Sequence, residues 1–391
     1  MTRPKVAFIF THRIQYFTNL LDELHQRKKL EILAIYAHET RNIYDSGFGR
    51  RIEWDNRGQV RCGELLMSDT VNKPLSPFVN SFSANIYGVL RRFKPDIVHL
   101  NGYGHGIQWQ VWLWARLNKI RIFVRGDGDT LRQNETLLNS TKRLLARCFA
   151  KAAHKVFFQG EENKNFWIAN GARPESLQWI PCVSDTQIFQ KSAFSSGAAR
   201  LNFRKEHGAG ADDVVFLVSG KLVSRKRPAD AIRALKLCER FPAHLWFLGS
   251  GPIEHELIEL AEELQISDRV KFWGFRNQTE IPPILQAADV LVHPSERDPW
   301  PYAVLEGAHS GLALLISSCT GSYRDWIEID HAGDVFQGGD VESLAAAMRT
   351  VINESEKLHR WQDAAKETAQ RHTETKFCEI FEKAAYAALA E

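Results

Sequence analysis

The chain has 391 residues, of which 44% are hydrophobic and 25% are charged. These fractions are ordinary for a folded globular protein and argue against a disordered or fibrous chain, and the length corresponds to two domains. The formal net charge is only +3 and the basic residues form no single run, which argues against a nucleic-acid-binding protein.

The cysteines and the N-terminus bear on where the protein works. The six cysteines are scattered, with no C-x-x-C pair and no zinc-like spacing with histidine, so we expect reduced thiols and no zinc site. The apolar run near the N-terminus is far too short for a signal peptide or a membrane span. The sequence therefore predicts a cytoplasmic protein.

Short apolar runs, each followed by a loop and a helical pattern, recur along the first half of the chain. They lie at residues 6–10, 32–36, 97–100, 120–124 and 156–159. Runs of this length rich in Val, Ile and Phe are typical of parallel strands with crossover helices. The first half therefore predicts a doubly wound α/β sheet.

The same pattern starts again in the second half. Strands are expected at residues 214–219, 245–249, 270–273, 290–293 and 313–317, with helices such as 228–240 and 254–264 between them. Two successive doubly wound sheets follow. Ligands of open α/β sheets bind at the carboxyl ends of the strands, so a site is expected in the loops after these runs.

Residues 184–210 separate the two series of strands. This stretch is punctuated by Gly and Ser and lacks sustained periodicity, which suits an interdomain connection. We expect a first domain over residues 1–190 and a second over 200–371. The closing segment is helical by pattern, and by analogy with chains of this architecture the helix 372–391 is expected to join the first domain.

An acidic pair follows the fourth strand of the second series. Asp298 lies in the loop, a helix is expected from near Tyr302, and Glu306 lies eight positions after Asp298. Two carboxylates at this separation suit a ligand with two polyol rings, and a helix N-terminus favours phosphate. The alternative is that Asp298 merely caps the helix and that Glu306 faces solvent.

A basic loop follows the first strand of the second series. Within SGKLVSRKRP, residues 219–228, the cations Lys221 and Lys226 can neutralise a departing diphosphate. A solvated basic turn is the alternative. The acidic pair at neighbouring strand ends favours the functional interpretation, because sugar hydroxyls, diphosphate and ribose hydroxyls are the groups of a nucleotide-sugar.

The succession of GKLVSRKRP, FLGSGP, VKFWGF, AADVLVHPS and DPWPYAVLEGAHSG, within residues 214–348, resembles the donor domain of glycosyltransferase family 4. The resemblance implies the GT-B fold, in which two Rossmann-like doubly wound domains face a central cleft. It implies a retaining glycosyltransferase without cofactor or metal. Such an enzyme moves a sugar from a nucleotide-diphosphate sugar to a saccharide or lipid-linked acceptor, commonly in surface polysaccharide or glycoconjugate assembly.

The resemblance also implies roles for individual residues. The family's diphosphate-binding loop matches Gly220, Lys221 and Lys226. An arginine of the family has become Lys221, which keeps the charge but loses the planar fork. The family's paired glutamates match Asp298 and Glu306, which implies that Asp298 contacts the transferred sugar and Glu306 the ribose.

The sequence departs from the family beside the acidic pair. Asp298 is one methylene shorter than the usual glutamate, and Pro301 replaces a glycine whose N–H faces the donor. Since proline cannot donate, the amides of Trp300 and Tyr302 would have to serve instead. We interpret the change as a shifted donor specificity or geometry, with a degenerate non-catalytic copy as the alternative.

Two further segments match the family more loosely. Phe275 and Arg276 follow a strand where backbone groups of the family commonly read the nucleobase. Thr320 and Gly321 stand in place of a pair of glycines in a turn of the donor site.

Two loops of the first half are candidates for acceptor binding. His12, Arg13 and Gln15 follow the first strand, where the family's acceptor loop lies. Asn101 and His105 lie in NGYGHG after the third strand, a glycine-rich loop without the spacing of a dinucleotide fingerprint.

The loop RGDGDTL, residues 125–131, follows the fourth strand and is more polar than a turn requires. We expect Arg125 and Asp127 to line the active site. Asp127 and Asp129 also spell the Asp-x-Asp pattern that binds manganese in another glycosyltransferase fold. An ordinary turn, in which Asp side chains bond their own backbone, is the competing interpretation.

Two more segments suit a glycolipid acceptor. The aromatic loop 44–55 could stack on sugar faces, or be a packed surface loop. Residues 142–151 form a cationic amphipathic pattern that could contact the inner face of an anionic membrane peripherally, or simply pack on its own sheet.

Two other functions keep the same fold. One is a sugar-nucleotide epimerase that hydrolyses its substrate, and the other is a non-catalytic nucleotide-sugar-binding protein.

Overall fold

The computed structural model describes residues 3–13, 16–39, 43–53, 62–70, 78–131 and 137–390, and the side chains of all of these except 43 and 137–142. The chain divides into two compact units. Unit 1 comprises Met1–Arg41, Asn56–Val183 and Thr373–Glu391, and unit 2 comprises Asn42–Asp55 and Ser184–His372.

Unit 1 is built on a parallel sheet of seven strands in the order β5-β2-β1-β6-β7-β8-β9. The strands are β1 Lys5–His12, β2 Glu31–His38, β5 Gly63–Leu66, β6 Ile97–Asn101, β7 Arg121–Arg125, β8 Lys155–Phe158 and β9 Leu177–Trp179. The helices are α1 Tyr16–Gln26, α2 Ile86–Phe93, α3 Gly106–Leu117, α4 Leu137–Ala152, α5 Glu161–Ala169 and α14 Glu374–Ala390, with short 3-10 turns at Phe78–Ser81 and Pro174–Ser176.

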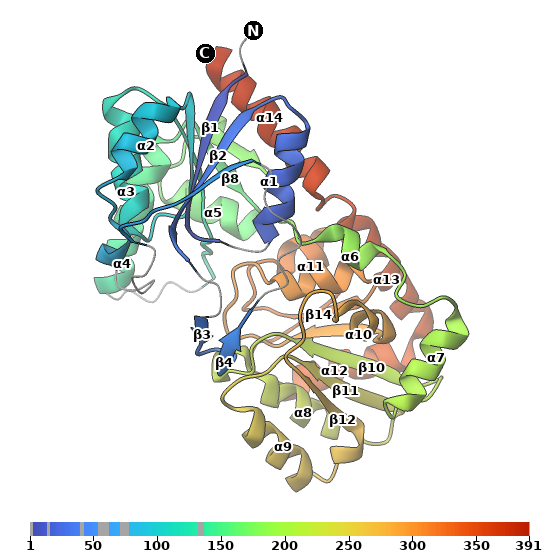
Figure 1. Ribbon diagram of the computed structural model, residues 1–391. Coiled ribbons are helices and arrows are strands. Elements are labelled where there is room, and N and C mark those ends of the chain that lie inside the picture. The colour runs from blue at the N-terminus through green and yellow to red at the C-terminus, as the bar shows by residue number, and fades with distance from the viewer. Residues whose placement is uncertain are drawn as a thin grey trace. The chain divides into compact units, whose positions relative to one another are not determined.

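Helices cover both faces of this sheet (Figure 1). Helices α1 and α14 pack on one face, where Phe381 of α14 stacks on Phe8 of β1 with ring centroids 5.1 Å apart. Helices α2, α3 and α4 supply the buried side chains of the other face. Because the inner strands are covered on both sides, β1 and β7 contain continuous apolar runs rather than alternating ones.

Unit 2 contains a parallel sheet of six strands in the order β12-β11-β10-β13-β14-β15 and a small antiparallel hairpin of β3 and β4. The strands are β3 Ile43–Asp45, β4 Arg50–Ile52, β10 Val214–Ser219, β11 Ala243–Leu248, β12 Val270–Gly274, β13 Val290–His293, β14 Ala313–Ser317 and β15 Gly333–Phe336. The predicted fold class, two doubly wound α/β sheets, is therefore confirmed.

Eight α-helices belong to the described part of unit 2. They are α6 Thr186–Gln190, α7 Gly197–Glu206, α8 Pro228–Lys236, α9 Glu254–Glu263, α10 Pro282–Ala287, α11 Tyr302–His309, α12 Val341–Asn353 and α13 Ser355–Ala369. Short 3-10 turns lie at Ser224–Lys226 and Ser267–Arg269, and a π-helical turn lies at Arg324–Ile329.

The hairpin of β3 and β4 differs from the sequence analysis, which grouped residues 44–55 with the first half of the chain. In the structure this segment is part of unit 2. The reason is local packing: Lys221 pairs with Asp45, and the hydroxyl of Ser250 donates to the carbonyl oxygen of Phe48. Strands of three residues in a polar segment give no periodic signal, so the pattern of the sequence could not place them.

A buried ion pair ties α7 to the sheet of unit 2. Arg204 is 1% exposed, and its Nη1 donates to both carboxylate oxygens of Asp289 at 3.0 and 2.9 Å. Asp289 also accepts from the amide of Val215 at the start of β10, at 2.8 Å. The pair thus joins the helix to the central strand.

We expect Arg204→Ala to lower the free energy of unfolding by about 3–5 kcal/mol, because it leaves the carboxylate of Asp289 without its most buried partner. Urea denaturation followed by circular dichroism measures this loss. Arg240→Ala, which removes an exposed arginine of the same unit, is the control and should leave the midpoint unchanged. Equal unfolding midpoints for the two variants would contradict a stabilising role of the Arg204–Asp289 pair.

Candidate functional site

The strand order of unit 2 defines where a ligand can bind. β10 pairs with β11 on one side and with β13 on the other, all in parallel. The chain runs outward from β10 through β11 to β12, and then returns to the other side of β10 as β13. The loops after β10 and β13 therefore diverge in opposite directions, which leaves a crevice at their carboxyl ends.

The loops after β10 and β13 are joined by hydrogen bonds. The amide of Glu296 donates to the carbonyl oxygen of Arg225 at 2.9 Å, and the Arg225 guanidinium donates to the carbonyl oxygen of Arg297 at 3.4 Å. These contacts bring together the basic loop and the acidic loop that the sequence analysis placed at neighbouring strand ends.

Lys226 and Asp298 meet at this point. The Nζ of Lys226 donates to Oδ2 of Asp298, and both side chains are mostly buried, at 19% and 16% exposed. Both residues are predicted catalytic residues, and they lie 72 positions apart in the chain. The structure therefore brings the two predicted groups into direct contact.

His293, the last residue of β13, is a third member of the cluster that the sequence analysis did not assign to the site. Its Nε2 lies 3.4 Å from Oδ2 of Asp298, an electrostatic contact rather than a full hydrogen bond. Burial lowers the pKa of His293, and the nearby Lys226 charge adds to this effect while Asp298 opposes it. His293 is therefore neutral near pH 7.

Asp298 is held in its charged form. Burial alone would raise its pKa, but the contacts with His293 and Lys226 outweigh burial and hold the pKa well below its usual range.

A sequence signal for His293 was present, since a polar residue that ends a buried strand points to the carboxyl edge of the sheet.

The remaining predicted residues of this half surround the pair. Pro301 is the residue before helix α11, and Glu306 lies in that helix with 6% of its surface exposed. The amide of Gly321 donates to the carbonyl oxygen of Asp298 at 2.8 Å. A Cβ at position 321 would lie 2.3 Å from the carbonyl oxygen of Pro299, so this close approach requires glycine.

Trp300 and Tyr302 flank Pro301. The Trp300 side chain is buried and its ring stacks on His372 at 5.8 Å, so only its backbone could serve a ligand. Tyr302 is the first residue of α11. The expectation that these two amides replace the missing N–H of Pro301 stays a prediction.

The other predicted donor residues lie along the opposite half of the same sheet. Gly220 follows β10 with φ of +131°, a conformation open to glycine. Lys221 donates from Nζ to both carboxylate oxygens of Asp45, at 2.9 and 2.8 Å. Phe275 follows β12, and Arg276 donates to the carbonyl oxygen of Trp273 at 3.2 Å. Through its ion pair with Asp45, Lys221 is bound to the hairpin of β3 and β4.

In unit 1, the predicted catalytic Arg125 is buried. It is 2% exposed, and its guanidinium lies over the rings of Phe17 and Phe377 at 5.3 and 5.8 Å. The side chain thus points into the aromatic interior of unit 1 rather than out of the loop. Asp127 accepts a hydrogen bond from Gln159 at 3.0 Å.

The predicted acceptor residues of unit 1 form part of a histidine cluster. Burial lowers the pKa of His12 to about 4, with contributions from His105 and His38. His105 precedes α3, and its carbonyl oxygen accepts from the amide of Gln108 at 3.2 Å. His38 is a member that the sequence analysis missed. Burial also lowers the pKa of His105, so His12 and His105 are neutral near pH 7 and can accept protons from hydroxyl groups.

The other predicted residues of this group have structural partners. Arg13 pairs with Glu64 at 2.6 Å, and the carbonyl oxygen of Asn101 accepts from Gln108. Gln15 lies outside the described residues. Among the residues that the structure describes, no three His, Cys, Asp or Glu side chains are grouped so that they could hold a metal ion.

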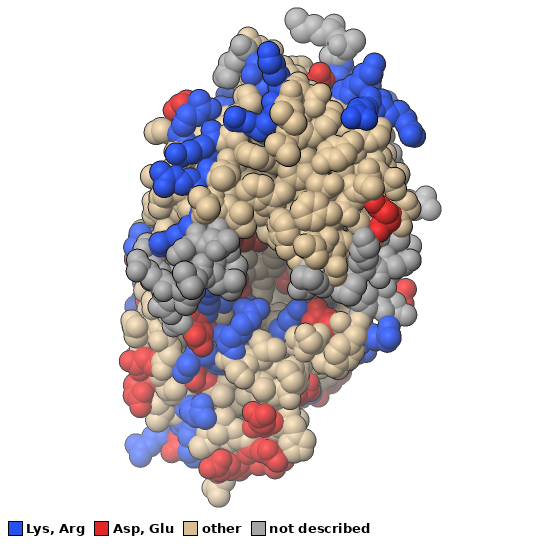
Figure 2. Space-filling model, turned by 90° about the vertical axis from the view of Figure 1, so that its left-hand side faces the viewer, with Lys and Arg blue, Asp and Glu red and all other residues tan. Residues whose placement is uncertain are grey.

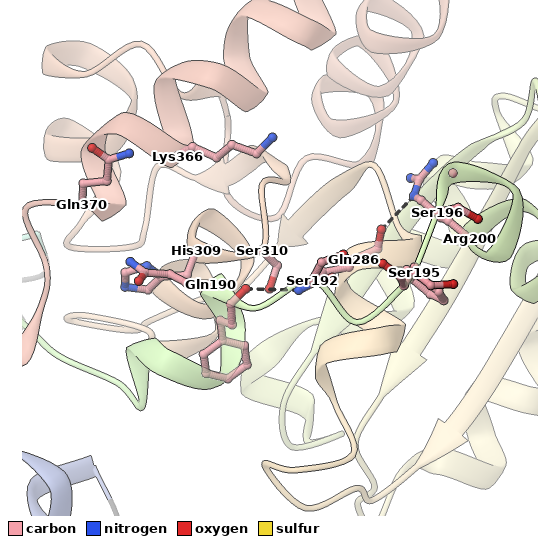
Figure 3. Close-up of a pocket in the computed structure, with 13 residues that line it drawn as sticks. Gln190, Ser192, Ser195, Ser196, Arg200, Gln286, His309, Ser310, Lys366 and Gln370 are labelled. Carbon is pink, nitrogen blue, oxygen red and sulfur yellow. Dashed lines mark hydrogen bonds between the residues drawn. The ribbon is translucent and has the colours of Figure 1, made fainter.

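A separate cavity of about 880 Å³ lies elsewhere in unit 2. Figure 3 shows Lys366 of α13 and Gln370, the residue after this helix, on one side of it. Arg200 and Gln286 lie on another side, where the Arg200 Nε donates to the Gln286 carbonyl oxygen at 2.8 Å. None of the predicted site residues lines it. We therefore place the candidate site at the carboxyl ends of β10 and β13.

Known proteins resemble this chain in both sequence and fold. The chain matches the family described as Glycosyl transferases group 1 over residues 199–368, which includes the loops after β10 and β13. It is similar to the lipopolysaccharide core biosynthesis glycosyltransferase LpsD of Rhizobium meliloti, with 33% identity over 360 residues, 90% of this chain and 88% of that protein.

Two further proteins show the same likeness. A UDP-Gal:alpha-D-GlcNAc-diphosphoundecaprenol alpha-1,3-galactosyltransferase of Escherichia coli is 25% identical over 281 residues, 69% of this chain and 70% of that protein. The crystal structure of Anabaena HepE in complex with UDP superposes with a TM-score of 0.75 at 16% identity, over 98% of this chain and 100% of that chain. At that identity the superposition shows the fold alone, which is the predicted GT-B fold.

We expect Asp298→Asn to lower stability at pH 7 by about 1–3 kcal/mol, because it leaves Lys226 without its charged partner. The depressed pKa of Asp298 means that the carboxylate stabilises the fold above its unfolded pKa of about 3.9 and loses this effect as the pH falls through the folded pKa. Thermal unfolding measured from pH 8 downward should show a constant gap between wild type and variant, narrowing only in acid.

A different dependence of this gap on pH would contradict the prediction. A gap that closes between about pH 7 and pH 6, around the ordinary pKa of histidine, would show that His293 titrates there and that the pair is not the stabilising contact.

Proposed function

The chain belongs to the glycosyl transferases of group 1, and on that premise we propose that it is a retaining, metal-independent glycosyltransferase of family 4. Its donor is a nucleotide-diphosphate sugar bound at the carboxyl edge of the second sheet. The observation that carries the proposal is the contact between Lys226 and Asp298 at the point where the strand order reverses.

Lys226 supplies the positive charge that a leaving diphosphate requires. A half-buried ammonium stabilises the charge that develops on the departing oxygen, and this stabilisation is stronger in a partly desolvated crevice than in water. Lys221 at the start of the same loop provides a second cation. Electrostatic stabilisation by the two side chains gives a reason to expect transfer without a metal ion.

Asp298 acts on the sugar side of the bond. Its carboxylate stays ionised at neutral pH and accepts hydrogen bonds from sugar hydroxyls, and we assign the ribose hydroxyls to Glu306 in the following helix. The acceptor hydroxyl attacks the anomeric carbon from the side on which the diphosphate leaves, and the phosphate oxygen takes its proton. The C–O bond to the phosphate breaks as the new glycosidic bond forms, so the anomeric configuration is retained.

A non-catalytic nucleotide-sugar-binding protein is the second candidate. The specific observation in its favour is Pro301, which stands immediately before helix α11 and cannot donate a backbone hydrogen bond there. Donor binding without turnover over saccharide and glycolipid acceptors would support this candidate.

The face of unit 1 formed by α2, α3 and α4 favours a lipid-linked acceptor at a membrane. The sequences of these helices contain no acidic residue, and they expose basic side chains at Arg91, Arg92, Arg116, Arg143, Arg147 and Lys151. Figure 2 shows this face, where blue side chains surround a broad uncharged area with few red ones in unit 1.

Apolar side chains are exposed on the same helices. Leu113 and Leu117 of α3 are 50% and 75% exposed, and Leu144 of α4 is 62% exposed. Basic charge combined with exposed leucine is the composition of a surface that lies on an anionic bilayer. In the described part of the chain no helix has the length and apolar character needed to cross a bilayer.

We expect Lys226→Ala to weaken donor binding by about 10- to 100-fold, because a hydrogen bond between charged groups contributes about 1.5–3 kcal/mol. Calorimetric titration with UDP-, GDP-, TDP- and CMP-sugars, without and with EDTA, identifies the donor and then measures the loss. Lys236→Ala, which breaks a surface pair with Glu239, is the control and should bind like the wild type. Unchanged affinity in Lys226→Ala would remove this residue from the donor site.

We expect Arg143→Glu combined with Arg147→Glu to reduce binding to phosphatidylglycerol vesicles by at least about tenfold, since each basic residue near an anionic surface contributes about 1 kcal/mol. Vesicle co-sedimentation measures this loss. Lys376→Glu combined with Lys383→Glu makes the same charge change on α14, which packs on the other face of the sheet. Equal losses for the two double variants would mean that this face is not the membrane contact.

A further inference from the structure

The hairpin of β3 and β4 contacts the carboxyl ends of three neighbouring strands of unit 2. Asp45 reaches Lys221 after β10, and the carbonyl oxygen of Phe48 accepts from Ser250 after β11 at 3.0 Å. After β12, the carbonyl oxygen of Glu53 accepts from the side chain of Asn277 at 3.3 Å. The hairpin therefore covers the β12-β11-β10 side of the edge where a ligand of such a sheet binds.

Asp45 is held ready for its contact with Lys221. Its Oδ1 accepts from the amide of Gly47 at 2.8 Å and from that of Phe48 at 3.2 Å, which closes a turn around the carboxylate. Burial would raise the pKa of Asp45, but the hydrogen bond and charge of Lys221, with the two amides, leave it below the usual range. The carboxylate of Asp45 is thus ionised and held in position by the two amides and by Lys221.

The lysine is enclosed as well as paired. Its Nζ lies over the ring of Phe48, 4.9 Å from the centroid. A Cβ added at Gly47 would lie 2.5 Å from Cδ of Lys221, so the turn rests directly on the stem of the lysine. In this state the ammonium of Lys221 donates its hydrogen bonds to the carboxylate of Asp45.

We propose that Asp45 is a specificity-determining residue of the donor site, an internal anion that the diphosphate of the donor replaces on Lys221. This inference rests on the proposed function, in which Lys221 binds phosphate. A diphosphate carries more charge than one carboxylate, so it can compete for the ammonium, but it approaches against the repulsion of Asp45. Ligands with less phosphate charge cannot make that exchange as well.

The other contacts keep the hairpin at the nucleoside end of the donor. The rings of Phe48 and Phe275 meet edge to face at 5.2 Å, and the guanidinium of Arg50 lies over Phe275 at 5.1 Å. These contacts do not involve the carboxylate of Asp45. Loss of the ion pair therefore frees Lys221, while Phe48 and Phe275 keep their positions beside the expected nucleobase.

The experiment compares Asp45→Asn with Glu53→Gln by calorimetric titration against inorganic pyrophosphate and against UDP and GDP. Asparagine keeps the oxygen that accepts from Gly47 and Phe48, so the turn is retained. Glu53 is exposed on the same hairpin, and its glutamine variant makes the same charge change away from Lys221. We expect Asp45→Asn to bind pyrophosphate and the matching nucleoside diphosphate about 3- to 10-fold more tightly, through reduced repulsion, and Glu53→Gln to equal the wild type.

A double-mutant cycle tests the partner. In a Lys221→Met background, Asp45→Asn should no longer tighten pyrophosphate binding, because the lysine that is released is missing. Unchanged or weaker binding by Asp45→Asn, or the same gain in Glu53→Gln, would overturn the inference while leaving the proposed function intact. Wild-type protein that binds no nucleoside diphosphate and no nucleotide-sugar would instead overturn the proposed function.

Discussion

Strand β10 lies in the middle of its sheet and is hydrogen-bonded to β11 on one side and to β13 on the other. Because β10 and β13 are neighbours in the sheet, the loops that follow them begin side by side at its carboxyl edge. Lys226 of the first loop and Asp298 of the second meet there. The buried Arg204–Asp289 pair secures the same strand from its amino end through the amide of Val215. The strand thus has a fixed amino end and a carboxyl end that opens onto the site.

Both lysines of the basic loop are neutralised within the chain. Lys226 is paired with Asp298 and Lys221 with Asp45, and all four side chains are at least partly buried. A half-buried cation without a partner is costly, so the two carboxylates stabilise these lysines in the absence of a ligand. The two pairs lie on opposite halves of the strand edge, one near the sugar end and one near the nucleoside end of the proposed donor.

Much of this arrangement could be predicted from the sequence. Buried parallel strands are uninterrupted apolar runs, so their positions and the site at their carboxyl ends follow from pattern alone, and Lys226 and Asp298 were placed together on that ground. Asp45 could not be found in this way, since its partner is 176 positions away and its strand has three residues. The surroundings of Arg125 could not be found from the sequence for a related reason, since the two phenylalanines that enclose its guanidinium come from distant helices, and its role in the active site stays a prediction.

The division of the chain between the units has a consequence for synthesis on the ribosome. Unit 1 is completed only by Thr373–Glu391, whose Phe377 and Phe381 fill the core against β1. The first sheet to emerge is therefore among the last parts to be fully covered, and the area that α14 covers stays open while the whole of Ser184–His372 is being made. Apolar surface that is exposed in this way during synthesis is prone to aggregation.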